Sequence, residues 1–461
     1  MAVNYRKRTG FSARTRTRYV RMRLTTDLKP DKNRLAIYDY YECDCSENGV
    51  QNLPEWAPVY NQKGDQYKCN IVNMLEVGSY KVAASEFAPY MDWYYMTSKP
   101  GAFFIYVEEV GGFYTAVSGL NRISVQPLMG KNETTYGVFG SGKFVMVSTS
   151  GAYTTPISQG VTSTGALFRH RVFVGVRGGV LKYSAPEDFR NFTESVDAGG
   201  CIRFPDGGGE IIAIKVHDDA LYVFFNSGII RLEIGGDPCE YRAEKIDYTG
   251  GDIYARTICV CDHAIYFMCK SGIYRLNGKK VERLDVGVIL PQEESGLEGC
   301  AVWKGLPLFR YVQSNGVYKT LAIRADGSAF FMSDLEGLGH GENGKVLFVD
   351  AGKRLYQLVN DGEGEIWFSG YFSTVDTDFG YVGRKSLRKL RLFGEGTVEV
   401  SLWNGYRSVY KTLTFENGVT EWKLTECGET FRFYITLHRA SKIRELHVEF
   451  DTVTSYKEDK S

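Results

Sequence analysis

The fold is decided by Ala220-Leu-Tyr-Val-Phe-Phe-Asn-Ser-Gly-Ile-Ile-Arg-Leu232, which recurs 44 residues later as Ala264-Ile-Tyr-Phe-Met-Cys-Lys-Ser-Gly-Ile-Tyr-Arg-Leu276. The two copies share Ala-x-Tyr, Ser-Gly-Ile and Arg-Leu in register. Each copy predicts a β-hairpin, because two apolar runs flank a Ser-Gly turn in which glycine tolerates a positive φ. The spacing of 44 residues matches one four-stranded blade of a β-propeller.

More distant versions of this hairpin occur on both sides of the two copies. They are Arg171–Tyr183, Lys345–Leu358, Phe103–Tyr114, Lys143–Tyr153 and Leu308–Ile323. A pair of β-sandwiches is the alternative, but near-regular spacing of hairpins favours radial repetition. We therefore predict a β-propeller of five to seven blades over residues 101–360.

The pattern of apolar and polar residues changes near Asp361, where a turn-rich stretch interrupts the hairpins. Beyond Arg384 the apolar residues alternate with polar ones, which predicts five or six half-buried strands and a small C-terminal antiparallel β-sandwich over residues 384–453. Residues 24–100 are irregular and rich in tyrosine, and we expect them to join the β-body. The predicted fold class is therefore all-β, a propeller followed by a sandwich and preceded by a basic, extended N-terminal arm.

The N-terminal arm, residues 1–23, is strongly basic. It contains no acid and eight cations, namely Arg6, Lys7, Arg8, Arg14, Arg16, Arg18, Arg21 and Arg23. The whole chain has 55 Lys and Arg and 55 Asp and Glu, so the remainder carries 47 cations against 55 anions. We expect a partner to order the arm and these eight residues to contact nucleic acid or an acidic neighbouring subunit. A solvated terminus is one alternative, and a strand docked on another chain is a second.

Composition excludes several classes of protein. With 43% apolar residues the chain can form a core, and no apolar run approaches the roughly 18 residues of a membrane span. No apolar segment of a secretory signal follows the basic N-terminus. The ten cysteines form no Cys-x-x-Cys pair, which is typical of a reducing compartment. A soluble intracellular product is therefore expected.

Motifs for catalysis, cofactors and metals are not found. Cys259, Cys261 and His263 could share a strand face, but their spacing fits no zinc pattern and packing is the better interpretation. No His-Glu-x-x-His or Gly-x-Ser-x-Gly segment occurs, and the glycines at 207–209 lack the Lys-Ser/Thr of a phosphate loop. The stretch 184–189 lacks the Gly and Trp of a sialidase box. We predict no catalytic, cofactor-binding or metal residue, and no enzyme.

Three segments resemble tail structural proteins of tailed bacteriophages, in particular the nozzle or tail-hub proteins (tail tubular protein B-like) of short-tailed phages. They are Tyr41–Pro54; Arg171–Gly175 with Lys182–Phe189, Glu210–Lys215 and Ala220–Phe224; and Ser369–Phe372 with Arg384–Leu390. Pro54-Glu55 departs from the family's Pro-Gly ending. The resemblance covers about two thirds of the chain and implies a non-enzymatic virion protein of the tail or head-to-tail connector, made in the host cytoplasm.

The same resemblance implies the partners. They are further copies of the chain in a ring of six, neighbouring tail or connector proteins, and DNA that passes through the lumen during ejection. The acidic remainder of the chain beyond residue 23 would repel DNA phosphates from the lumen and so reduce adhesion during ejection. The many tyrosine and phenylalanine residues suit contacts between subunits. Two alternatives stay open: a free β-propeller that binds a protein or glycan partner, and a glycan-cleaving propeller.

Overall fold

A computed structural model gives the structure of the 461-residue chain. It describes residues 13–25, 34–41, 43–46, 49–53, 55–58, 77–80, 91–96, 102–107, 112–117, 124–129, 134–140, 142–148, 153–195, 198–235, 240–261, 263–284, 286, 297–312, 318–332, 339–340, 346–349, 355–359, 363–365 and 369–455. In these ranges the chain is all-β, and the one helix is the 3-10 turn Ala255–Thr257. Nowhere in them is a helix long and apolar enough to span a membrane.

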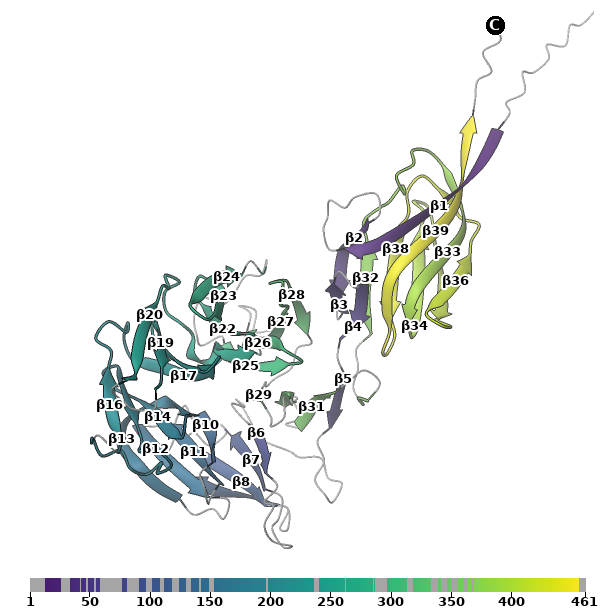
Figure 1. The fold of residues 1–461 in the computed structure, drawn as a ribbon. Coiled ribbons are helices and arrows are strands. Elements are labelled where there is room, and N and C mark those ends of the chain that lie inside the picture. The colour runs from purple at the N-terminus through teal and green to yellow at the C-terminus, as the bar shows by residue number, and fades with distance from the viewer. Residues whose placement is uncertain are drawn as a thin grey trace, which may run out of the picture. The chain divides into compact units, whose positions relative to one another are not determined.

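The chain divides into two units, which we call the propeller (residues 57–358) and the sandwich (residues 1–56 and 359–461). In the propeller, antiparallel sheets follow one another along the chain (Figure 1). Four have four strands each: β6–β9 (Val77–Tyr80, Met91–Met96, Ala102–Val107, Gly112–Val117), β17–β20 (Ile211–His217, Ala220–Phe225, Ile229–Glu233, Arg242–Ile246), β21–β24 (Cys259–Cys261, Ala264–Cys269, Gly272–Asn277, Lys280–Leu284) and β25–β28 (Leu297–Trp303, Leu306–Val312, Tyr318–Ile323, Ala329–Met332).

The remaining propeller sheet between them has seven strands and corresponds to two blades. It comprises β10–β16 (Ser124–Met129, Thr134–Gly140, Gly142–Ser148, Tyr153–Phe168, Arg171–Val176, Val180–Tyr183, Gly200–Arg203). The first half of the 16-residue strand β13 pairs with β12, and its second half pairs with β14. One long strand therefore ends one blade and begins the next.

A sheet made from both ends of the propeller segment completes the ring. It joins β29–β31 (Gly339–His340, Val346–Val349, Leu355–Val359) to β5 (Glu55–Pro58), which precedes the first blade in the sequence. The strand β29 also lies next to β6. The described residues thus form seven blade-sized units, the upper end of the predicted five to seven, and the last of them combines strands from both ends of the propeller segment.

The hairpins predicted from the repeat are confirmed as β18–β19 and β22–β23. Tyr222 stands opposite Arg231 in the first, and Tyr266 stands opposite Arg275 in the second. Both tyrosines are fully buried. The residues shared by the two copies therefore form one repeated cross-strand pair, which explains why they recur together. The five more distant hairpins are also antiparallel pairs.

Glycine is required at the turns of the two copies for different structural reasons. Gly272 has a φ of +148°, as a glycine-dependent turn requires. The expectation of a positive φ is wrong for Gly228, which is constrained instead by space, because a Cβ there would lie 2.2 Å from the carbonyl oxygen of Gly207. That oxygen belongs to the backbone and cannot move aside as a side chain could.

Substituting valine at either turn should destabilise the propeller. We expect Gly228→Val to cost about 1–3 kcal/mol through the clash with Gly207 and Gly272→Val a similar amount through backbone strain. Thermal unfolding of each variant measures the effect, with Lys270→Val, an exposed position in the same turn as Gly272, as the control. Unchanged melting of both glycine variants would contradict the hairpin register.

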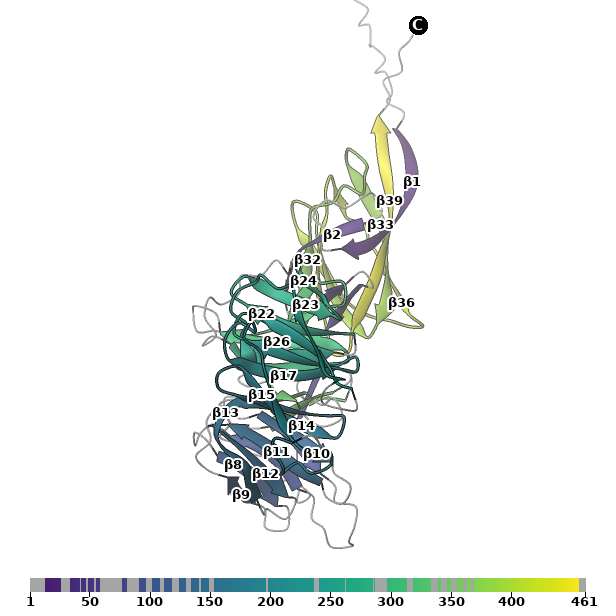
Figure 2. The same ribbon diagram turned by 60° about the vertical axis from the view of Figure 1, so that its left-hand side comes forward.

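The sandwich is built from both ends of the chain. One sheet contains β33 (Lys385–Glu395), which pairs with β36 (Val419–Lys423), β37 (Cys427–Gly428) and β39 (Lys442–Ser455). The other contains β2 (Arg34–Tyr41), β32 (Gly370–Thr374), β38 (Arg432–Leu437), β34 (Thr397–Trp403) and β35 (Ser408–Thr414) in that order. The strands β1 (Ala13–Thr25), β3 (Cys43–Ser46) and β4 (Gly49–Asn52) add to the first sheet, and β1 runs beside β39 in both ribbon views (Figures 1 and 2).

The observed boundaries correct the predicted domains. Residues 13–23 of the predicted arm form most of β1, and Met22 and Leu24 lie in the sandwich core. The region 24–100 does join the β-body, and it is shared between the two units, since β2–β4 belong to the sandwich and β6 and β7 to the first blade. The sandwich therefore includes residues that precede the propeller in the sequence, and its C-terminal part begins before the predicted residue 384. Pairing of distant strands, which local patterning does not report, sets these boundaries.

Candidate functional site: the basic edge strand

The strand β1 has one paired edge and one largely open edge. From Ala13 to Arg23 it pairs with β39 in antiparallel register, with Ala13 opposite Ser455 and Arg23 opposite Glu445. Its other edge pairs in the described residues only at Arg23–Thr25, in parallel with β2. Over the stretch 13–22 of β1, the backbone groups that point to this edge, those of alternate residues, can therefore pair with a further strand.

The predicted contact residues divide into three groups. Arg6, Lys7 and Arg8 lie outside the described residues. Arg14, Arg16, Arg18, Arg21 and Arg23 lie on β1, where Arg16, Arg21 and Arg23 are exposed and Arg18 is half-buried. The structure thus places five of the eight predicted residues on a single strand.

Two of these arginines are engaged within the chain. Arg21 forms a bidentate ion pair with Glu445, with its Nε 2.5 Å from Oε2 and its Nη2 3.0 Å from Oε1. The Arg18 guanidinium lies 5.0 Å from the centre of the Tyr381 ring. Among the described residues no ion pair engages Arg16, which lies in the stretch with the open edge, or Arg23, which lies where β1 meets β2. Both side chains are exposed and can meet an anionic partner.

The expectation that only a partner orders the arm is wrong for residues 13–25. The physical reason is the apolar end of the strand, because Met22 and Leu24 are each 2% exposed and anchor β1 in the core. The anion that Arg21 meets is on β39 of the same chain. Whether the strand also meets nucleic acid or a neighbouring subunit stays a prediction.

A buried carboxylate ties β1 to the first sheet. Asp451 on β39 accepts a hydrogen bond from Thr17 Oγ1 at 2.8 Å and one from Arg388 Nε at 2.6 Å. The Thr17 hydrogen bond and the Arg388 guanidinium hold the pKa of Asp451 below its ordinary value, against the opposing effect of burial. The ionised carboxylate thus links three strands.

Acidification should loosen this link. A carboxylate with a lowered folded-state pKa stabilises the fold above its unfolded-state pKa, and this contribution is lost as the pH falls through the folded-state pKa. The window lies below the ordinary value of 3.8. When the pH is lowered from neutral to below 3.8, we expect Thr17→Val to lose less stability than the wild type in thermal unfolding, because this variant lacks the hydrogen bond that lowers the pKa of Asp451. Thr412→Val, an exposed control, should follow the wild type; parallel pH profiles for Thr17→Val would contradict the link.

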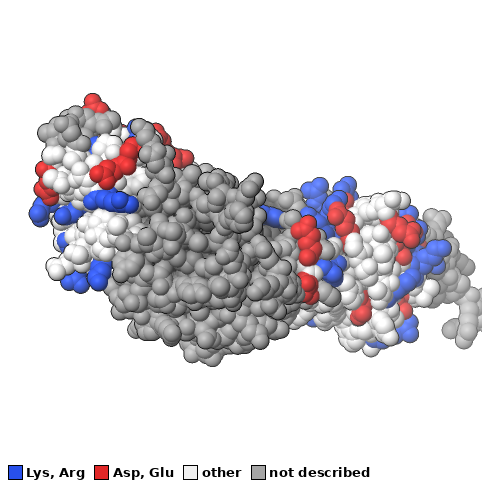
Figure 3. Space-filling view, turned by 90° about the horizontal axis from the view of Figure 1, so that it is seen from below, with Lys and Arg blue, Asp and Glu red and all other residues white. Residues whose placement is uncertain are grey.

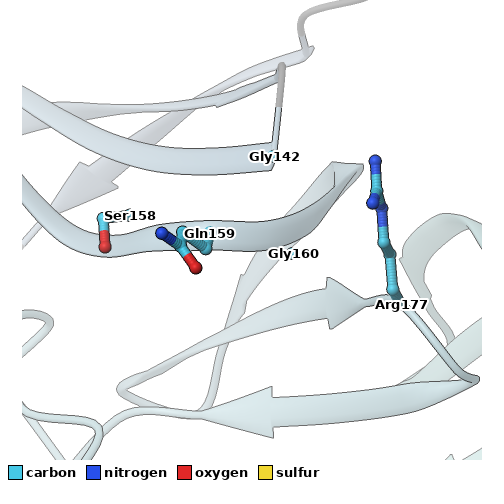
Figure 4. A pocket seen from close by; sticks show the side chains of 5 residues that line it. All are labelled: Gly142, Ser158, Gln159, Gly160 and Arg177. Carbon is cyan, nitrogen blue, oxygen red and sulfur yellow. The ribbon is translucent and has the colours of Figure 1, made fainter.

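Two open depressions lie among the described residues of the propeller, and the first is polar. It has a volume of about 450 Å³ and is lined by Gly142, Ser158, Gln159, Gly160 and Arg177. The side chain of Arg177 stands beside the backbone of Gly160, and Ser158 and Gln159 lie along the same strand (Figure 4). This arrangement offers hydrogen-bond donors but no paired groups for acid–base chemistry.

The second depression combines acids with arginines. It has a volume of about 760 Å³, and its lining includes Asp219, Glu233, Arg169 and Arg231. Arg169 pairs with Asp219, and Arg231 pairs with Glu233. The hydrogen bond from Arg231 lowers the pKa of Glu233, whereas a carboxylic acid that donates a proton to a leaving group needs a raised pKa. Glu233 therefore does not suit the role of general acid.

The thiols considered for a metal site are packing residues. Cys259 and Cys261 are each 2% exposed, and burial raises the pKa of the Cys259 thiol, as do hydrogen bonds to neighbouring thiols. His263 Nε2 lies 2.8 Å from the Tyr266 hydroxyl. In the part of the chain that the structure describes, no three His, Cys, Asp or Glu side chains are placed to hold a metal ion.

Comparisons with known proteins found distant likenesses to solved structures alone. No family model matches the sequence, and no curated protein matches it. One similar solved structure is an exo-beta-1,3-galactanase from Phanerochaete chrysosporium, with 9% identity over 86% of this chain and 100% of that chain and a TM-score of 0.29. Another is PorZ, a bacterial surface component of the type-IX secretion system of Porphyromonas gingivalis, with 10% identity over 77% of this chain, 46% of that chain and a TM-score of 0.38. The chain thus spans less than half the length of PorZ, and at these TM-scores neither likeness carries an argument about function.

The comparison nevertheless corrects one prediction. The exclusion of an enzyme is withdrawn: a galactan-cleaving enzyme is among the similar structures, although a likeness at this TM-score gives this chain no activity. The exclusion rested on missing local motifs, and the two carboxylates that cleave a glycosidic bond are set by their separation in space and need not be close in the sequence. The all-β fold itself, a propeller with a sandwich, agrees with the sequence prediction.

Proposed function

We propose that the chain is a structural protein of a phage tail or head-to-tail connector, that copies of it form a ring, and that DNA passes through this ring during ejection. The observation that carries the proposal is the open, cationic edge of β1. A free strand edge offers main-chain pairing to a neighbour, and its arginines select an acidic one. A contact between two different surfaces of identical copies closes into a ring when the rotation permits.

Charge distribution supports a second copy as that acidic neighbour. The sandwich beyond residue 23 carries 17 Lys and Arg against 23 Asp and Glu, whereas the propeller carries 30 against 32. Acidic and basic side chains are interspersed on the described faces of both units in Figure 3. The anionic excess therefore resides mainly in the sandwich, where the arginine edge of the next copy can meet it.

The resemblance to tail nozzle and tail-hub proteins supports the virion assignment. Its first segment, Tyr41–Pro54, includes β3 and β4 and ends just before β5. Its last segment begins at β32 and ends within β33. These are the stretches in which the chain leaves the sandwich for the propeller and returns to it. On this proposal the ring has six copies, contacts neighbouring tail or connector proteins and resides in the virion tail.

The proposal is tested by assembly of edge variants. Deleting residues 1–23 would remove Met22 from the core, so the test variant is Arg14→Glu with Arg16→Glu, which reverses charge without emptying the core. We expect closed rings for the wild type in light scattering and negative-stain imaging, and smaller species for the variant. Lys411→Glu, at an exposed position on the edge strand β35, is the matched control and should still assemble.

Two results would count against the proposal. Equal assembly of the Arg14/Arg16 variant and the wild type would remove the role of the β1 edge. A wild-type monomer of 51.9 kDa that binds a glycan or protein partner would favour the free propeller module instead.

A further inference from the structure

The outer side of the second sandwich sheet exposes tyrosine rings in two neighbouring cross-strand rows. In the first row Tyr434, Ser401 and Tyr410 stand opposite one another on β38, β34 and β35. In the second row Tyr371, Thr436, Glu399 and Thr412 follow on β32, β38, β34 and β35. We call these seven residues the tyrosine face.

The tyrosines of this face do not serve the core. Tyr410 is 76% exposed, and Tyr371 and Tyr434 are each 40% exposed. The residues that alternate with those of the tyrosine face along β38 and β34, such as Phe433 and Val400, point to the core and are fully buried. Strand propensity accounts for tyrosine in a strand, but folding gains little from a ring as exposed as that of Tyr410, and Tyr434 also leaves part of its ring in water. Exposed aromatic clusters with polar surroundings mark binding surfaces.

The charge of the face selects the class of ligand. Glu399 is its one charged side chain, and Arg432 in the next row is paired with Asp376 at 2.9 Å. A nucleic acid would meet a carboxylate here and no unpaired cation among the described residues of the face, so its phosphates would be repelled. An uncharged ligand rich in hydroxyl groups has no such cost, and the Ser, Thr and Glu side chains can exchange hydrogen bonds with it.

The spacing suits a chain of sugar rings. Tyr434 and Tyr410 are on strands separated by β34, which places them about 10 Å apart. That separation is close to the length of a disaccharide unit in an extended polysaccharide, so alternate sugars can stack their apolar faces on the two rings. Ser401 lies between them, and Glu399 and Thr436 lie alongside in the second row.

We propose that the tyrosine face binds an uncharged, extended polysaccharide. The binding site lies on the sandwich, and it does not depend on the proposed role in a phage tail. Tyr434 and Tyr410 stack on the sugar rings, and Glu399 accepts hydrogen bonds from sugar hydroxyls.

Affinity electrophoresis of the full chain in native gels tests this site, with laminarin, arabinogalactan, xylan and dextran as uncharged probes and dextran sulfate as the charged one. We expect an uncharged probe to retard the wild type and Tyr410→Ala with Tyr434→Ala to weaken binding about tenfold or more, the effect of losing about 1.4 kcal/mol. Glu399→Gln should weaken binding by a smaller factor. Tyr406→Ala is the matched control, because Tyr406 is 87% exposed but lies in the turn between β34 and β35.

Three results would overturn the proposal. One is no retardation by any uncharged probe, and another is equal binding by the double variant and the wild type with unchanged melting of both. The third is a change in particle mass of the double variant without a change in glycan binding, which would assign the face to a second copy of the chain.

Discussion

Replacing Leu24 by alanine is expected to lower the free energy of unfolding of the sandwich by about 2–5 kcal/mol. Leu24 is 2% exposed and packs in the same core as Leu35, Phe372 and Leu446. The truncation removes buried apolar surface and leaves a cavity that the surrounding strands fill only in part. Denaturant unfolding followed by circular dichroism, together with hydrogen exchange of the β39 amides, measures the loss.

The control for this prediction is the neighbouring residue on the opposite face of the strand. Arg23 is exposed, so Arg23→Ala should change the free energy of unfolding by no more than about 0.5 kcal/mol. If Leu24→Ala proved equally mild, β1 would be detachable, as predicted from the sequence for the arm of residues 1–23, and the β1–β39 pairing would not contribute to the fold.

Replacing Tyr222 by alanine is expected to destabilise the propeller by about 3–5 kcal/mol, the range for large buried aromatic side chains. Tyr222 is fully buried, and its hydroxyl donates a hydrogen bond to the carbonyl oxygen of Gly278 at 3.1 Å. Gly278 lies in the turn between β23 and β24 of the following blade, so the side chain joins two blades. Thermal and denaturant unfolding of the variant measure the effect.

A conservative variant separates the two contributions of this tyrosine. Tyr222→Phe keeps the ring and removes only the hydrogen bond to Gly278, which should cost about 0.5–1.5 kcal/mol. An equal loss for Tyr222→Phe and Tyr222→Ala would show that the ring is not packed as described. Wild-type stability of Tyr222→Ala would contradict the assignment of the repeat to neighbouring blades.

The sequence patterns were sufficient for the hairpins because a hairpin is a local structure. The two strands of each copy of the repeat are separated by a short turn, so apolar runs and the Ser-Gly dipeptide carry the necessary information. The closure of the ring by β5 and the pairing of β1 with β39 join segments from opposite ends of the chain. Periodicity within a short window contains no record of such partners.

The two candidate sites also differ in how far the sequence alone could predict them. The charge of β1 is visible in the sequence, but its ordering depends on Met22 and Leu24, two apolar residues at the end of an Arg/Thr segment. The tyrosine face was not predicted, because Tyr410 and Tyr434 look like ordinary strand residues until the register sets them in one row. Alternation with Phe433 and Ile435 was the one available signal that Tyr434 faces outward.

The central claim, that copies of this chain form a ring, is tested most directly by the mass and shape of the full chain at rising concentration. Light scattering followed by negative-stain imaging should show closed rings whose mass is a multiple of 51.9 kDa, six copies on the present account. The Arg14→Glu, Arg16→Glu variant should shift to smaller species under the same conditions. A 51.9 kDa monomer at every concentration, unaffected by the charge reversal, would contradict the account.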